Sequence, residues 1–341
     1  MLALLVAAVL VPESADVVLS IEDVSGLRAL LEKAGTHAPS LAPEPIGTTL
    51  RDRVGIDLLA ESPAWGLAPR GARMLSFSRR AIGLSAPLRD GNAAKKMLSA
   101  WLAQNPRRAG RVVGSRLLTA SGQDAAALLT AMARPAAVPR ELAAHAKRAL
   151  WLWARMDEPL RAVALSIEAS GFGVVARGLV TAKGAILAGR APAGCEATIA
   201  CLRAGLGPAG RGALAHALEQ LGIPAQPELP AAARVEERVE AIEARQLSGP
   251  QSLPRALRIA AVFDRPEAAP TALEGRIDLA SIDAALAALT PLDAFQGALA
   301  ASAYAMHLLY GRLLRNAGPL TLTGSPQRGG SAEIEVRLPL R

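Results

Sequence analysis

The pattern with the most chemical promise in the sequence is a glycine-rich stretch, in which Gly205, Gly207 and Gly210 match GxGxxG. In dinucleotide-binding folds this pattern joins a strand to a helix, and its backbone amides approach the pyrophosphate. The context is poor here, because residues 198–202 form only a short expected strand and the region around Glu228 is rich in proline. We therefore interpret the stretch as an ordinary loop before a helix. A nucleotide-cofactor enzyme using Gly205–Gly210 is the weakest functional hypothesis.

Two cysteines, Cys195 and Cys201, are the next candidates for chemistry. Their spacing fits neither a zinc knuckle nor a redox CxxC motif. Two interpretations stay open: a local disulfide in an exported chain, or two small apolar side chains buried on one short element. The four histidines lie far apart in the sequence: His37, His145, His216 and His307. The sequence therefore predicts no metal site, no cofactor and no catalytic residue.

Two tryptophans carry a ligand-binding hypothesis. Residues 149–156 are typical of a strand in which Trp151 and Trp153 share one face and leucines take the other. A strand that is apolar on both faces is covered on both faces. The cover over the tryptophans is either protein, which we favour, or an apolar ligand such as a lipid.

The first fifteen residues bear on the compartment of the protein. Residues 2–11 are an unbroken apolar run that ends at Pro12. The run is too short to cross a bilayer, which takes roughly 20 residues, and it has the length of a signal-peptide core, about 7–15 residues. No Lys or Arg precedes it, and Glu13 is a poor neighbour for Ala15, the best small residue for cleavage. We expect residues 1–15 to be a truncated signal-like or hydrophobic leader of a periplasmic or envelope protein; the alternative is a buried strand of a cytoplasmic protein.

The composition predicts a globular protein with a basic surface. The chain has 341 residues, 51% of them hydrophobic, and a formal net charge of +8. The arginines are scattered, and the densest groups, Arg79-Arg80 and the trio Arg107, Arg108 and Arg111, are small. Aromatic residues make up only 3% of the chain, whereas single-strand binders need aromatic stacking platforms. We expect no nucleic-acid partner, no transmembrane span, and at most peripheral contact with an anionic membrane surface.

Hydrophobic periodicity and turn residues organise the chain into two units. The expected strands of the first half are 16–22, 72–79, 81–88 and 111–120, and the expected helices are 24–34, 48–59, 92–104 and 124–132. The second half is expected to hold strands 149–156, 161–169 and 173–181, a helix over 211–221, and a closing hairpin of 320–324 and 332–340. Pro135 and Pro139 mark the boundary, which gives units of 16–134 and 135–341. Strand hairpins followed by helices predict an α+β fold, with helices packed on one face of antiparallel sheets.

Three stretches resemble a group of uncharacterised exported bacterial proteins. They are a Pro-x-x-Ala-Asp-Val strand from Pro12 to Val17, an Ala-Leu-Trp-Leu-Trp-Ala strand over residues 149–154, and a Gly-x-Gly turn from Gly171 to Gly173. The resemblance implies an exported α+β protein and carries over no activity or functional residue. The leading hypothesis is a non-enzymatic envelope protein with a structural, assembly or binding role. The alternative is a periplasmic carrier that binds an apolar or lipid ligand at Trp151 and Trp153.

Overall fold

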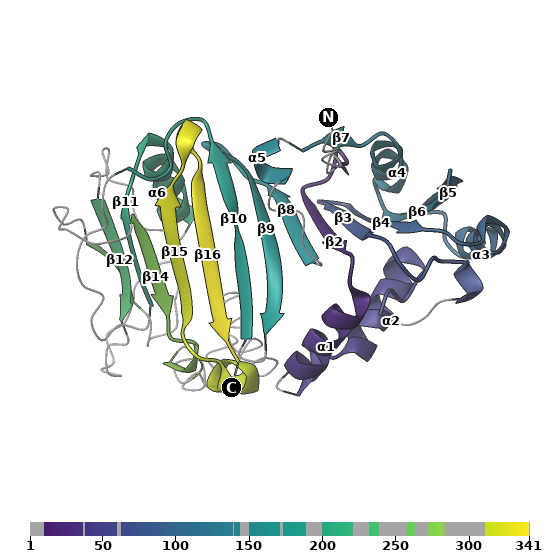
Figure 1. The fold of residues 1–341 in the computed structure, drawn as a ribbon, viewed down its shortest axis with the longest axis horizontal. Helices are drawn as coiled ribbons and strands as arrows, with labels where there is room; N and C mark the ends of the chain where they lie inside the picture. Colours follow the sequence, from purple (N-terminus) through teal and green to yellow (C-terminus); the bar gives the residue numbers. More distant parts are fainter. Residues whose placement is uncertain are drawn as a thin grey trace, which may run out of the picture. The chain divides into compact units, whose positions relative to one another are not determined.

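The computed structural model describes residues 10–36, 38–59, 63–138, 140–143, 150–170, 173–188, 200–220, 232–238, 258–262, 272–281, 283 and 311–340. The chain forms two compact units. Unit 1 comprises Met1–Thr36, Ser40–Met156 and Ala162–Glu168, and unit 2 comprises His37–Pro39, Asp157–Arg161 and Ala169–Arg341. Each unit combines antiparallel strands with helices, so the predicted α+β class is confirmed (Figure 1).

The sheet of unit 1 runs in the order β8-β2-β3-β4-β6-β5, and every neighbouring pair is antiparallel. Its strands are β2 (Val17–Ile21), β3 (Arg73–Ser78), β4 (Ala81–Pro87), β5 (Arg108–Val113), β6 (Arg116–Gly122) and β8 (Leu150–Arg155). Residues 162–166 of β9 (Leu160–Ser170) pair with the outer side of β8. Because β8 pairs with β2, the chain leaves unit 1 after Met156, beyond the predicted boundary at the two prolines.

Three helices cover one face of this sheet: α1 (Val24–Gly35), α2 (Pro43–Val54) and α3 (Gly91–Ala103). The core between them includes Leu84 and Leu117 from the strands and Trp101 from α3. Helix α2 begins earlier than predicted, because proline in a first turn loses only an amide that has no partner within the helix. It ends at Gly55, the residue predicted to break it.

The opposite face of the sheet is covered by α4 (Ala125–Ala133). Neighbouring residues of a strand point to opposite faces, so Leu117 enters the core below α2 and α3 whereas Leu118 packs against Leu128 and Met132 of α4. The prediction of one covered face thus holds for the three longer helices of unit 1, and α4 adds cover on the second face. Short elements complete the unit: 3-10 turns Pro39–Leu41 and Pro63–Trp65, and α5 (Arg140–Ala143).

Part of the expected leader belongs to unit 1. Strand β1 (Leu10–Val11) pairs with β7 (Ala136–Ala137). Ala15 is fully buried, and its N–H donates to the Pro12 carbonyl at 3.1 Å. Residues 10–15 therefore contribute to the fold, while residues 1–9 lie outside the described residues. Within the described part of the chain, no helix is both long enough and apolar enough to span a bilayer.

The sheet of unit 2 runs in the order β13-β12-β11-β14-β15-β16-β10 and is antiparallel throughout. Its strands are β10 (Gly173–Ala182), β11 (Ala200–Gly205), β12 (Ala232–Arg238), β13 (Arg258–Val262), β14 (Leu273–Ile277), β15 (Leu320–Pro326) and β16 (Ala332–Pro339). The predicted closing hairpin is β15–β16, joined by the 3-10 turn Arg328–Gly330.

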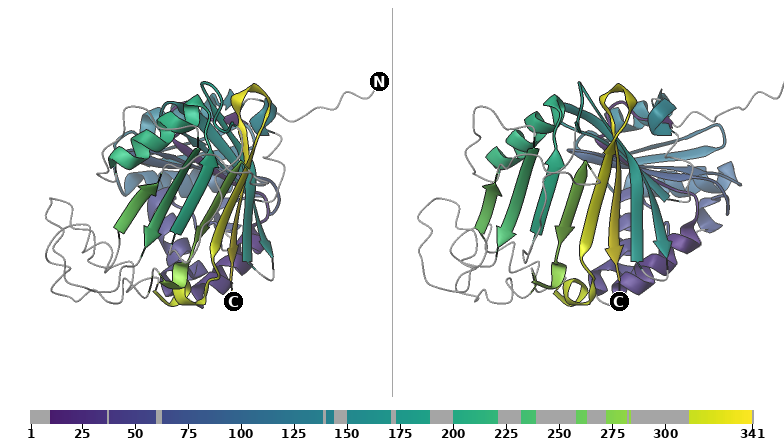
Figure 2. Two further views of the ribbon diagram at one scale, coloured as in Figure 1. Left: turned by 90° about the vertical axis from the view of Figure 1, so that its left-hand side faces the viewer. Right: turned by 60° about the vertical axis from the view of Figure 1, so that its left-hand side comes forward.

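One face of the unit 2 sheet is apolar and the other is charged. Helix α6 (Pro208–Gln220) lies across the strands (Figure 2), and its Leu214 packs on a core that includes Ala204 and Ala332. On the other face, Arg177 of β10 and Arg337 both pair with Glu335. The charged face of β16 thus carries one ion pair to β10 and one within the strand, and its alternating sequence predicts such a charged face.

Candidate functional site

The two tryptophans lie on one face of β8, as predicted. Trp151 is 3% exposed and Trp153 is 7% exposed. Their cross-strand neighbours on β2, Ser20 and Val18, are also buried. The protein itself therefore closes the tryptophan face, and a ligand could reach it only if that cover moved. The ligand-binding role of the tryptophans stays a prediction.

The glycine-rich stretch joins β11 to α6, and its glycines serve chain packing. A Cβ at Gly207 would lie 2.3 Å from the Ala185 carbonyl oxygen, and one at Gly210 would lie 2.1 Å from the Ile186 carbonyl oxygen. The N–H of Gly207 donates to Ile186 at 2.9 Å, and the N–H of Ala209 donates to Ala185 at 3.0 Å. Amides that would hold a pyrophosphate are thus engaged by backbone carbonyls. The stretch is a loop before a helix, as we interpreted it.

Of the two cysteines, Cys201 lies in β11, and Cys195 lies outside the described residues. The disulfide stays a prediction. Among the residues that the structure describes, no three His, Cys, Asp or Glu side chains gather closely enough to hold a metal ion.

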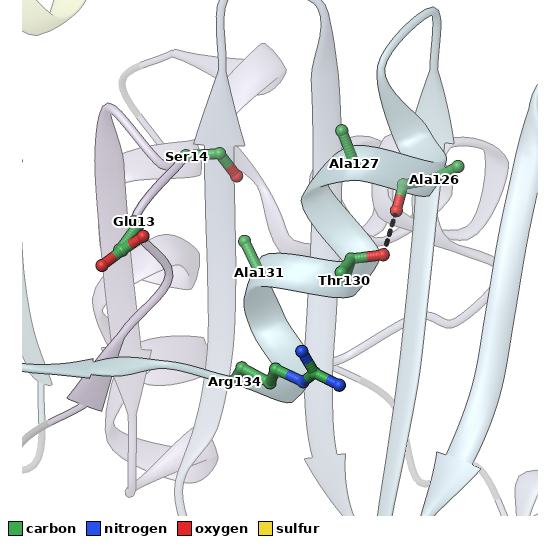
Figure 3. A pocket seen from close by; sticks show the side chains of 7 residues that line it. All are labelled: Glu13, Ser14, Ala126, Ala127, Thr130, Ala131 and Arg134. Atoms are coloured by element: carbon green, nitrogen blue, oxygen red, sulfur yellow. Dashed lines mark hydrogen bonds between the residues drawn. The ribbon is translucent and has the colours of Figure 1, made fainter.

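An open depression of about 590 Å³ lies between α4 and the residues that precede β2 (Figure 3). Its lining is Glu13, Ser14, Ala126, Ala127, Thr130, Ala131 and Arg134. The Thr130 hydroxyl donates to the Ala126 carbonyl of its own helix at 2.9 Å. Three of the seven lining residues are alanines, two carry hydroxyl groups, and one acid and one arginine complete the lining. It offers weak apolar contact and no pairing of a nucleophile with a base.

Arginines from three separate segments converge at one end of the unit 1 sheet. The turn after β6 is the meeting point: the N–H of Gln123 donates to the Arg80 carbonyl at 2.9 Å, and the N–H of Gly122 donates to the Arg107 carbonyl at 3.0 Å. The Ser121 hydroxyl donates to the carbonyl of Arg53. We call this set the arginine corner and define it as Arg53, Arg79, Arg80, Arg107 and Arg108.

Local structure explains how each segment reaches the arginine corner. Arg79 and Arg80 form the two-residue turn between β3 and β4, since Ser78 pairs with Ala81. Arg53 lies in the last turn of α2. Gly122 has a φ of 118°, and a Cβ there would lie 2.2 Å from the Arg80 carbonyl oxygen, so only glycine allows the two turns to meet this closely.

Four side chains of the arginine corner are exposed and carry uncompensated charge. Within the described residues, no ion pair or side-chain hydrogen bond involves Arg53, Arg79, Arg80 or Arg107. Two acids lie near these arginines and are fewer than them: Asp52 precedes Arg53, and Asp124 follows Gln123, whose N–H donates to the Arg80 carbonyl. Like charges held together raise the local potential and attract anions over several ångströms. The arginine corner is therefore a positive surface.

Arg108 has a different place in the arginine corner, because it is anchored. Its Nη1 donates to the Trp101 carbonyl at 2.9 Å and to Gln104 Oε1 at 2.7 Å. Its guanidinium carbon lies 4.8 Å from the centre of the Trp101 ring, within cation–π range. Trp101 is 5% exposed. Arg108 therefore adds fixed charge at the base of the surface and joins α3 to β5.

Two other arginines of unit 1 are structural. Arg73 is 9% exposed and donates to the Leu58 carbonyl at 2.9 Å. Arg116 donates from Nε to the Ser85 hydroxyl at 2.8 Å. Burial lowers the pKa of both guanidinium groups from the usual value for arginine. Unlike the exposed arginines of the arginine corner, Arg73 and Arg116 donate hydrogen bonds to backbone carbonyls and a hydroxyl group of the protein itself.

The sequence shows Arg79-Arg80 and Arg107-Arg108 only as separate short groups, and nothing in it marks Arg53. The available signal was the position of Arg80 between two expected strands, 72–79 and 81–88, which predicts a turn there with Arg79 at the end of the first strand. Their meeting depends on the register of β3, β4 and β6 and on the close approach at Gly122.

No protein-family model and no curated protein matches the chain. Its structure is similar to three crystal structures of TP0453, forms III, IV and I, with 12–13% sequence identity. The similarity covers 50–51% of this chain and 77–81% of TP0453, with TM-scores of 0.29–0.30. TM-scores this low carry no argument about the chain.

Proposed function

We propose that the chain is an exported, non-enzymatic binding protein of the cell envelope that holds an anionic partner at the arginine corner. The observation that carries the proposal is the convergence of Arg53, Arg79-Arg80 and Arg107 around one turn, with no ion pair to these side chains among the described residues. Exposed arginines that share one end of a sheet produce a positive potential, which attracts an anionic partner.

The binding role is favoured over a nucleotide enzyme by the glycine-rich stretch. The amides of Gly207 and Ala209 already donate to backbone carbonyls, so a pyrophosphate would have to break those bonds. Export is supported by the apolar run at residues 2–11. Because β1 pairs with β7 and Ala15 is buried, we further propose that the exported protein keeps residues 10–15 in its fold. Intact mass and N-terminal sequencing of the natively expressed protein test this point.

The binding proposal is tested with the full chain on a heparin column, because heparin is a soluble polyanion. The double variant Arg79→Ser/Arg80→Ser removes two exposed charges from the arginine corner. The matched control is Arg70→Ser/Arg89→Ser, which removes two exposed arginines near the opposite end of β4. We expect the corner variant to elute at clearly lower salt than the wild type and the control to elute near the wild type, since salt screens these contacts. Equal shifts in both variants would reject the arginine corner as the binding surface.

A further inference from the structure

We infer that the anionic partner is the phosphate layer of a phospholipid bilayer. This inference rests on the proposed function, because it names the partner of the same arginine corner. Three features of the surface lead to it: the kind of cation, the arrangement of the cations, and the absence of an exposed stacking ring among the described residues nearby.

The cation of the arginine corner is arginine at all five positions. The guanidinium group is planar and offers paired N–H donors that match two phosphate oxygens, whereas an ammonium group acts as a point charge. Of the five, only Arg108 spends donors on the protein itself among the described residues. The four exposed guanidinium groups therefore keep their donor pairs for phosphate.

The arrangement suits a broad surface and not one small ligand. The exposed arginines come from a hairpin turn, the last turn of α2 and the segment before β5, all at one end of the sheet. Figure 1 shows β3, β4, β6 and β5 side by side in unit 1. The depression beside α4 contains none of these five arginines. Cations carried by three segments can meet several headgroups of a bilayer, which presents phosphates across a plane.

The aromatic residue at the arginine corner argues for phosphates and against bases. Trp101 is 5% exposed, and the Arg108 guanidinium covers its ring. Single-stranded nucleic acid is held by bases that stack on exposed rings as well as by contacts to phosphate. Trp101 cannot serve as such a platform, so lipid phosphate is the partner that the described surface fits.

The test measures co-sedimentation of the full chain with phosphatidylcholine vesicles prepared with and without phosphatidylglycerol. A basic residue near an anionic bilayer contributes about 1 kcal/mol, so loss of two arginines lowers the partition coefficient about 30-fold. We expect the wild type to bind only the vesicles that contain phosphatidylglycerol. The partition coefficient of Arg79→Ser/Arg80→Ser should be about 30-fold lower than that of the wild type. The partition coefficient of Arg70→Ser/Arg89→Ser should stay close to the wild-type value. Should the turn variant fail to fold by circular dichroism, Arg53→Ser/Arg107→Ser replaces it.

The outcomes separate this inference from the proposed function. Heparin binding that depends on Arg79 and Arg80, without binding to anionic vesicles, would overturn the lipid inference and leave the proposed function intact. Corner-dependent binding of single-stranded DNA in place of vesicles would make nucleic acid the partner and also overturn it. If the wild type binds neither heparin nor vesicles, the proposed function itself is rejected.

Discussion

Replacing Gly55 by alanine tests the packing that supports the arginine corner. Gly55 ends α2 with a φ of 86°, and its N–H donates to the Arg51 carbonyl at 2.9 Å. A Cβ at this position would lie 2.9 Å from both Cε2 and Nε1 of Trp101. The indole ring has little room to yield, because it is 5% exposed and Arg108 stacks on it. Alanine therefore meets both an unfavourable backbone conformation and a steric clash.

The two costs have separate sizes. The left-handed backbone costs alanine roughly 1 to 2 kcal/mol, and forcing a methyl group into a packed core costs roughly 1 to 3 kcal/mol. Gly55→Ala should thus lower the free energy of unfolding by about 2 to 5 kcal/mol. For a unit of this size the melting temperature falls roughly 2 to 4 °C per kcal/mol, so a decrease of about 4 to 20 °C is expected.

Gly114→Ala is the matched control. Gly114 has a φ of 54°, and a Cβ there would meet nothing within 4 Å, so this variant pays only the backbone cost. Both variants are compared in urea unfolding followed by circular dichroism and tryptophan fluorescence. If Gly55→Ala is no more destabilised than Gly114→Ala, the described contact between Gly55 and Trp101 is not a tight one, and the reasoning fails.

Three further predictions concern the described core and the charged face. Thr119→Val removes the buried hydroxyl that donates to the Val54 carbonyl at 2.8 Å, so the urea midpoint should fall by the equivalent of about 1 to 3 kcal/mol; no change would contradict this bond. Leu84→Ala leaves a cavity at a fully buried position and should lower the free energy of unfolding by about 2 to 5 kcal/mol in the same assay. A loss no larger than that of an alanine substitution at an exposed position would show that Leu84 is not packed in the core. Hydrogen bonds from Arg177 and then Arg337 lower the pKa of the Glu335 carboxyl. The stabilisation that these hydrogen bonds give is therefore present at pH values above the pKa of Glu335 in the unfolded chain. It is lost as the pH falls through the lower pKa of Glu335 in the folded protein. Glu335→Gln should flatten the acid side of the stability profile, and an unchanged profile would show that the ion pair contributes nothing.

Local pattern was sufficient for many elements. The alternating apolar residues of 72–88 correspond to β3 and β4. Asp90 precedes the expected helix and is the N-cap of α3, where its carboxylate accepts from the N–H groups of Asn92 and Ala93. The alternation of Glu333 to Leu338 correctly predicts that β16 has a charged face and an apolar face. These features depend on neighbours in the sequence, so the sequence alone reveals them.

Long-range pairing was not predictable in the same way. The partner of β8 is β2, more than a hundred residues earlier along the chain, and this pairing moves the unit boundary. The arginine corner likewise depends on strand register and on Gly122. Because Gly122 has no side chain, the turn after β6 can hydrogen-bond to the carbonyls of both Arg80 and Arg107. The strand pattern of residues 149–156 predicts that Trp151 and Trp153 are covered, whereas the identity of their neighbours on β2 follows only from long-range pairing.

Contact between the arginine corner and an anionic bilayer is best located by a measurement that needs no substitution. Hydrogen–deuterium exchange of the full chain is measured with and without vesicles that contain phosphatidylglycerol, and again with heparin. We expect slower exchange in the three segments that carry the arginine corner, residues 51–54, 78–81 and 105–108, and no change in residues 66–70 and 88–90. Protection confined to other segments, with none at these three, would contradict it.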